Sequence, residues 1–131
     1  MARVLIIDDD PQIRYCLRLI LQADRHEVCT AKTGPAGLRC ASAEDVDLIF
    51  CDLFMPGQGG LETIRVLRRD FPRIQLIAMS GGGQHGQTEL LRVARGLGAA
   101  AVLPKPFSPV DVSSVVREVL EPSRGLPATE A

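Results

Sequence analysis

Polar residues directly follow several apolar runs in this 131-residue chain. Asp8 and Asp9 follow VLII, Asp52 follows LIFC, Ser80 follows LIAM, and Lys105 stands between two prolines. If the three acids meet, each pair of carboxylates about 4 Å apart repels by roughly 4 kcal/mol at an effective dielectric near 20. A bound divalent cation would relieve this repulsion. Mg²⁺ prefers carboxylate, water and phosphate oxygens, whereas Zn²⁺ prefers nitrogen and sulfur, so the set predicts a magnesium site.

Alternating strands and helices are predicted to position these residues. Short apolar runs predict strands at 4–7, 27–31, 48–52, 74–79 and 99–103. Helical spacing of apolar residues predicts helices at 11–24, 34–42, 61–70, 90–97 and 109–120. This alternation favours a parallel sheet covered by helices on both faces. The carboxyl ends of the strands would then share one edge, where open α/β sheets bind ligands.

Capping signals mark the ends of several predicted helices. Asp10 followed by Pro11 predicts an N-cap with proline at the first helical position. Gly98 is predicted to end the fourth helix, because glycine readily adopts the backbone conformation found after helix ends. Ser108 and Asp111 predict a capping box at the start of the last helix.

Composition limits the possible partners and location. Hydrophobic residues make up 46% of the chain, charged residues 24%, and the formal net charge is -1. We therefore expect no direct contact with nucleic acid or with an anionic membrane. No apolar run approaches the roughly 20 residues that span a bilayer, and the N-terminal run is too short for a secretory signal. A cytoplasmic location is predicted.

The other candidate residues are assigned structural roles. Four cysteines lack the spacing of a zinc or redox motif and are interpreted as small apolar thiols of a reduced protein. They are Cys16, Cys29, Cys40 and Cys51. His26 and His85 are expected in surface or loop positions. Four arginines in and after the third helix are interpreted as a solvated face. They are Arg65, Arg68, Arg69 and Arg73.

Four motifs in chain order, VLIIDDDPQIR, DLIFCDLFMPGQGGLE, IAMSG and GAAAVLPKPF, resemble the receiver domain of two-component response regulators. The resemblance spans about residues 3–120. It implies an α/β, flavodoxin-like fold: a doubly wound five-stranded parallel sheet in the order 2-1-3-4-5 with five helices. Residues 1–121 would form this domain, and residues 122–131 a flexible tail or linker stub.

The resemblance implies that Asp52 accepts a phosphoryl group from a phosphohistidine of a sensor histidine kinase or a histidine phosphotransfer protein. Asp8 and Asp9 would hold Mg²⁺ together with Asp52 and the backbone carbonyl of Phe54. The metal would neutralise charge on the transferring group.

Further residues would bind the phosphoryl oxygens. Lys105 would pair with them, across a cis Lys105–Pro106 bond. The Ser80 hydroxyl and the backbone amide of Gly81 would also bind them.

The chain departs from the family pattern at positions that transmit the signal. Val102 occupies the place of an aromatic residue in the last strand, and Gly59 that of an acid. The switch positions would be Ser80 and Val102. Because valine cannot act as the aromatic lever, we expect a population shift in the glycine-rich loop after Ser80 and in the helix over 90–97.

The predicted function is a phosphoacceptor signalling domain that promotes its own phosphorylation and dephosphorylation without being an enzyme. A downstream effector domain or protein would read its state. One alternative is a Mg²⁺-dependent phosphohydrolase, although Phe54 stands where such enzymes often place a general acid. The other is an unphosphorylated protein-interaction or scaffold domain.

Overall fold

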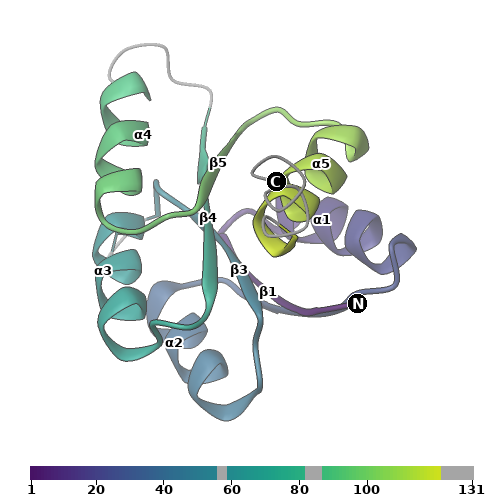
Figure 1. Ribbon diagram of the computed structural model, residues 1–131, viewed down its shortest axis with the longest axis horizontal. Helices are drawn as coiled ribbons and strands as arrows, with labels where there is room; N and C mark the ends of the chain where they lie inside the picture. The colour runs from purple at the N-terminus through teal and green to yellow at the C-terminus, as the bar shows by residue number, and fades with distance from the viewer. Residues whose placement is uncertain (56–58, 82–86, 122–131) are drawn as a thin grey trace, which may run out of the picture.

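Parallel strands form one central sheet in the order β2-β1-β3-β4-β5 (Figure 1). The computed structural model describes residues 1–55, 59–81 and 87–121, with the backbone alone for residues 87–91. Over this part of the chain the strands are β1 Arg3–Ile7, β2 Glu27–Ala31, β3 Leu48–Asp52, β4 Gln75–Ser80 and β5 Ala101–Pro104. The helices are α1 Pro11–Ala23, α2 Gly34–Ala43, α3 Gly60–Asp70, α4 Gln87–Gly96 and α5 Pro109–Leu120.

This architecture confirms the predicted fold class and strand order. Among the strands, the boundaries shift most at β5, which begins at Ala101 instead of at residue 99. The cause is local, because the Ala99 amide donates to the carbonyl of Ala94 and so still belongs to the turn that ends α4. The predicted tail over 122–131 lies outside the described residues.

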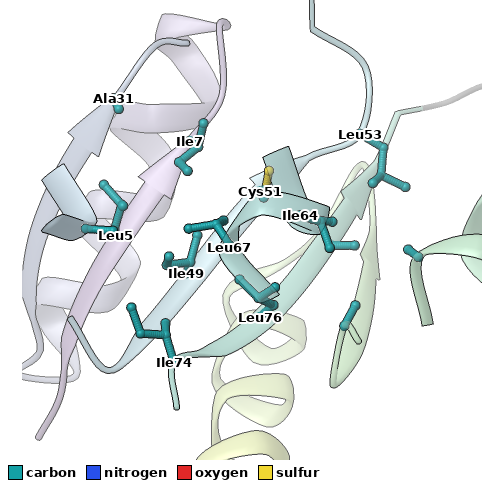
Figure 2. Close-up of a cluster of buried hydrophobic side chains, with 14 of the residues drawn as sticks. Leu5, Ile7, Ala31, Ile49, Cys51, Leu53, Ile64, Leu67, Ile74 and Leu76 are labelled. Atoms are coloured by element: carbon teal, nitrogen blue, oxygen red, sulfur yellow. The ribbon is translucent and has the colours of Figure 1, made fainter. Parts of the chain in front are cut away.

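Helices cover both faces of the sheet (Figure 1). Side chains of successive strand residues point to opposite faces, so each strand contributes to two cores. On one face, strand residues such as Ile7 and Ile49 pack with residues of α2, α3 and α4 (Figure 2). On the other face, Phe50 and its neighbours pack with α1 and α5. Among the described residues, no helix has the length and apolar character required to cross a bilayer.

The predicted helix caps are confirmed. The Asp10 side chain accepts a hydrogen bond from the Gln12 amide at 2.9 Å. Ser108 and Asp111 form the reciprocal bonds of a capping box at the start of α5. Gly98 has a φ of +115°, in the left-handed region that favours glycine.

The prediction that Arg68 belongs to a solvated face is wrong. Its Nη2 donates to the carbonyls of Phe71, Pro72 and Ile74, where the chain turns from α3 into β4. Sequence spacing places Arg68 near the solvent side of the helix, but its long side chain folds back over this turn. The other three arginines are exposed, as predicted: Arg65, Arg69 and Arg73.

Candidate functional site

The carboxyl ends of β1, β3, β4 and β5 bring the predicted site residues to one edge of the sheet. In the parallel register Ile7 lies beside Cys51, so the acids that follow these two residues are at the same level. Ser80 pairs with Pro104 at the ends of β4 and β5. Lys105 follows directly, and its amide donates to the Ser80 carbonyl at 2.8 Å.

Three carboxylates gather at this edge. One carboxylate oxygen from each of Asp8, Asp9 and Asp52 lies within 4.8 Å of the others. Asp8 is 0% exposed and Asp52 is 3% exposed, whereas Asp9 is exposed. The Asp10 amide donates to Asp8 Oδ1 at 2.9 Å, which fixes the orientation of the Asp8 carboxylate. The sequence prediction that these acids converge is therefore met in the structure.

The Asp52 carboxylate lies in an environment that disfavours its charge. Burial, followed by the negative charge of Asp8, raises the pKa of Asp52 from 3.8 to about 6. The ammonium of Lys105 and a hydrogen bond from the Phe54 amide act in the opposite direction. Asp52 is thus ionised at neutral pH and incompletely neutralised by its protein neighbours.

Lys105 joins the two buried acids. Its Nζ lies 2.8 Å from Asp8 Oδ2 and 3.3 Å from Asp52 Oδ1, and its side chain is only 15% exposed. Burial lowers the pKa of Lys105, but the hydrogen bond to Asp8 and the charges of both acids outweigh burial and raise it overall. The Lys105–Pro106 peptide bond is cis. One ammonium is therefore shared between the two buried carboxylates.

The donor set fits a hard divalent cation. Three clustered carboxylates offer oxygen ligands only, which suits Mg²⁺ and not Zn²⁺. Burial and the charge of Asp8, in that order, raise the pKa of Asp52, and a bound cation would stabilise its ionised form. The acids could hold a metal and still leave coordination positions for water and for a phosphate oxygen.

The remaining predicted site residues lie around this cluster. Ser80 is fully buried at the end of β4, and Gly81 follows it at the partly exposed rim. Val102 is partly buried and packs against the core beneath α2, α3 and α4. Gly59 caps the start of α3, and the Phe54 side chain is exposed.

The glycine-rich loop predicted to take part in the switch lies largely outside the described residues, as does His85. His26 is partly buried, and its Nδ1 accepts a hydrogen bond from the Ala2 amide at 3.0 Å. This bond ties the N-terminus to the turn after α1, far from the acidic cluster, so His26 has a structural role.

Two residues near the acidic cluster were not predicted from the sequence. Arg14 donates from Nη1 to the Asp8 carbonyl at 2.8 Å, which holds the turn that carries the acids. In the sequence, the position of Arg14 does not differ from that of an ordinary exposed arginine on a helix, so no pattern predicts this contact. Gly60 starts α3 so close to β3 that a Cβ would collide with the backbone of Asp52 and Leu53. In the sequence, only the pair Gly59–Gly60 indicates that α3 begins so close to β3.

Comparisons with known proteins agree with this geometry. A family model described as the response regulator receiver domain matches residues 4–117. The DNA-binding response regulator MtrA of Mycolicibacterium smegmatis is 31% identical over 130 residues, which cover 96% of this chain and 54% of MtrA. The cell cycle response regulator CtrA of Brucella ovis is 29% identical, over 94% of this chain and 52% of CtrA. The chain spans about half the length of these curated relatives.

A solved structure has the same fold. The receiver domain of NtrX from Brucella abortus superposes with a TM-score of 0.84 at 28% identity. The match covers 90% of this chain and 98% of that domain.

Proposed function

This chain belongs to the response regulator receiver domain family, and on that premise we propose that it is a phosphoacceptor whose Asp52 takes the phosphoryl group. The observation that carries the proposal is the position of Asp52. It is a buried carboxylate at the end of β3, within 4.8 Å of Asp8 and Asp9 and 3.3 Å from the Lys105 ammonium.

The proposed reaction is attack of an Asp52 oxygen on the phosphorus of a phosphohistidine. A P–O bond forms, the P–N bond breaks, and the imidazole leaves with the electron pair. With a pKa of about 6, Asp52 is ionised at neutral pH and available as the nucleophile. The Phe54 amide, which donates to this carboxylate, helps to orient it.

Lys105 and the neighbouring acids would organise the transferring group. The Lys105 ammonium lies between Asp8 and Asp52, so a phosphoryl oxygen on Asp52 would come within its reach. Asp8, Asp9, Asp52 and the Phe54 carbonyl would hold Mg²⁺, which when bound neutralises charge on the phosphoryl group. The Ser80 hydroxyl and the Gly81 amide would bind the remaining oxygens at the ends of β4.

The partners follow from this chemistry. A sensor histidine kinase or a histidine phosphotransfer protein would supply the phosphoryl group, and an effector domain or protein would respond to it. The response would be a population shift toward the phosphorylated arrangement of the segment after Ser80. Neither phosphohydrolase nor scaffold activity is favoured by any feature in the described part of the chain.

Intact mass spectrometry tests the acceptor. The full chain is incubated with Mg²⁺ and a small acyl phosphate, beside Asp52→Asn and the exposed control Asp45→Asn. We expect one added phosphoryl mass on the native chain and on Asp45→Asn, and none on Asp52→Asn. Lys105→Ala should react more slowly because the phosphoryl oxygens lose their cation. An equal gain on Asp52→Asn, or no gain on the native chain, would contradict the proposal.

A further inference from the structure

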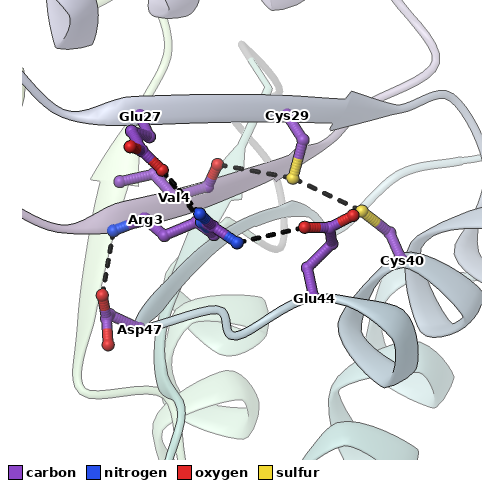
Figure 3. Close-up of polar contacts among 7 residues, drawn as sticks. All are labelled: Arg3, Val4, Glu27, Cys29, Cys40, Glu44 and Asp47. Atoms are coloured by element: carbon purple, nitrogen blue, oxygen red, sulfur yellow. Dashed lines mark hydrogen bonds and ion pairs between the residues drawn. The ribbon is translucent and has the colours of Figure 1, made fainter.

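Two cysteines outside the acidic cluster lie against each other. Cys29 Sγ, on β2, is 3.3 Å from Cys40 Sγ, on α2 (Figure 3). Both residues are partly buried, and both pack against the core between the sheet and α2. All four cysteines of the chain have free thiols, but only this pair is in contact within the described residues.

The fold itself produces this contact. β2 is an edge strand of the sheet. The helix that follows it, α2, runs back across one face of the sheet beside β2. Cys29 is the middle residue of β2 and points toward the last turn of α2, where Cys40 stands. Cys29 Sγ also lies 3.8 Å from the Val4 carbonyl, so its sulfur is directed between β1 and α2 (Figure 3).

We propose that Cys29 and Cys40 are a modification site that closes to a reversible intramolecular disulfide when the protein meets a peroxide. The two sulfur atoms need to approach by roughly 1.3 Å to reach the bond length near 2.05 Å. Rotation of two partly exposed side chains can supply this movement. The proposal does not depend on the phosphoacceptor role of Asp52.

The chemistry balances with one peroxide molecule for each disulfide. Cys40 first releases its thiol proton, and the thiolate Sγ attacks one peroxide oxygen. The O–O bond breaks, which leaves the sulfenic acid on Cys40, and the departing hydroxide combines with the released proton to form water. Cys29 Sγ then attacks the Cys40 sulfenic sulfur. The S–O bond breaks, the S–S bond forms, and the oxygen leaves as water with the Cys29 proton.

The environment of Cys29 favours Cys40 as the first cysteine to react. Burial, followed by the hydrogen bond with Cys40, raises the pKa of Cys29 to about 12. Because the thiolate is the reactive form, this raised pKa disfavours Cys29 as the thiol that reacts first with peroxide. The negative charge of Glu44 also raises the pKa of Cys29, while Arg3, which forms an ion pair with Glu44 at 3.1 Å, lowers it (Figure 3).

The disulfide would join an edge strand to its covering helix. β2 has only one neighbour in the sheet, β1, and three of its five residues are partly exposed. In the reduced protein, packing and the hydrogen bond between the two thiols hold α2 against β2. A covalent link between Cys29 and Cys40 would hold the two elements together.

Peptide mapping of the oxidised full chain tests the link. The reduced protein is treated with hydrogen peroxide, free thiols are blocked with N-ethylmaleimide, and the protein is digested with trypsin. Cleavage after Lys32 and Arg39 places Cys29 and Cys40 in separate peptides, 26–32 and 40–65. We expect these peptides to be linked and to separate on treatment with dithiothreitol.

Controls assign the bond to this pair. Peptide 40–65 also contains the buried Cys51, so fragmentation of the linked peptides must place the bond at Cys40. Cys40→Ser should abolish the link, and Cys16→Ser, which changes an exposed thiol, should keep it. The proposal is overturned by a bond at Cys51, by links between chains only, or by separate overoxidation of each cysteine without a link. The map of the native chain decides this even if Cys40→Ser does not fold.

Discussion

At the scale of single residues, Asp52 bears a charge that the metal-free protein does not fully neutralise. Its carboxylate is almost completely buried beside Asp8, and Lys105 is shared between the two acids. The raised pKa of Asp52 means that the folded state binds a proton at this site more tightly than the unfolded state does. The ionised carboxylate therefore lowers stability at neutral pH.

Replacing this charge should stabilise the metal-free fold. We expect Asp52→Asn to raise the free energy of unfolding at pH 7 by on the order of 1 kcal/mol, after allowance for solvent screening. The folded pKa is about 6 and the ordinary value is 3.8, so the native protein regains this stability as pH falls through that window. The difference in the free energy of unfolding between Asp52→Asn and the native protein should therefore be full above pH 6 and disappear near pH 4.

Denaturant unfolding with a metal chelator present measures this difference across the pH range. Asp45→Asn, at an exposed acid, serves as the control and should change little. A gain for Asp52→Asn that grows toward acid pH would show that the sign of the pKa shift is wrong.

At the scale of elements, the close approach of α3 to β3 positions Asp52. Gly60 begins α3, and a Cβ there would meet the Asp52 carbonyl oxygen and the Leu53 Cα. These are backbone atoms, which cannot turn aside as a flexible side chain can. The neighbouring Gly59 has open space around the position of a Cβ, and its φ is -72°.

The two glycines therefore form a matched pair. We expect Gly60→Ala to lower the free energy of unfolding by about 1–3 kcal/mol, because the added methyl overpacks the strand end. It should also slow phosphorylation, because Asp52 moves. Gly59→Ala should cost less than about 1 kcal/mol, as expected at an N-cap glycine. Equal losses in urea unfolding would show that α3 does not approach β3 so closely.

Arg68 makes a second element-scale connection, between the end of α3 and the start of β4. Its guanidinium donates to the carbonyls of Phe71, Pro72 and Ile74, and its Nε is buried without a hydrogen-bond partner among the described residues. Desolvation lowers its pKa, which agrees with a partly buried cation. Arg69, next in the helix, makes only an exposed ion pair with Asp70.

We expect Arg68→Ala to lower the free energy of unfolding by about 1–3 kcal/mol, because carbonyls lose a charged donor. Arg69→Ala should change it by less than about 1 kcal/mol, as is usual for an exposed pair. Thermal and urea unfolding of the two variants provide the comparison. Similar stabilities would mean that water replaces the Arg68 bonds without cost.

At the scale of the whole molecule, the acidic cluster connects distant parts of the chain. Lys105 and Asp8 are separated by 97 positions, and Lys105 and Asp52 by 53. A cation bound by the three acids would add to these connections in the folded state alone. Such binding stabilises the fold by mass action, because the unfolded chain does not assemble the site.

Mg²⁺ should raise the thermal unfolding midpoint of the native chain above that in NaCl of equal ionic strength. At a concentration about 100 times the dissociation constant, the added stability is roughly 2.7 kcal/mol. The effect should shrink as pH falls below about 6, because the proton on Asp52 competes with the metal. Asp8→Asn should reduce it at all pH values. An equal rise of the unfolding midpoint in NaCl would show that the effect comes from general ionic screening and not from bound Mg²⁺.

The sequence predicted most of the fold and the convergence of three acids at one edge of the sheet. Apolar runs and caps are local signals, because strand burial and helix capping depend on residues a few positions apart. Asp10, Ser108 and Asp111 could therefore be assigned to caps that the structure contains. The strand ends located Asp8, Asp9 and Asp52 at one edge, since parallel strands carry their carboxyl ends on the same side.

Only the tertiary structure decided how the side chains of distant residues meet. Arg68 was misassigned because a helical pattern gives the direction of a side chain but not the carbonyls to which a long one can fold back. The contact between Cys29 and Cys40 arises from the packing of α2 on β2, and no spacing rule marks it. The position of Lys105 between Asp8 and Asp52 likewise depends on the packed sheet. Local hydrogen bonds and periodicity depend on residues that are neighbours in the sequence, so the sequence alone determines them. Burial, the distances between side chains of different strands and the resulting charge balance arise only when the chain is packed.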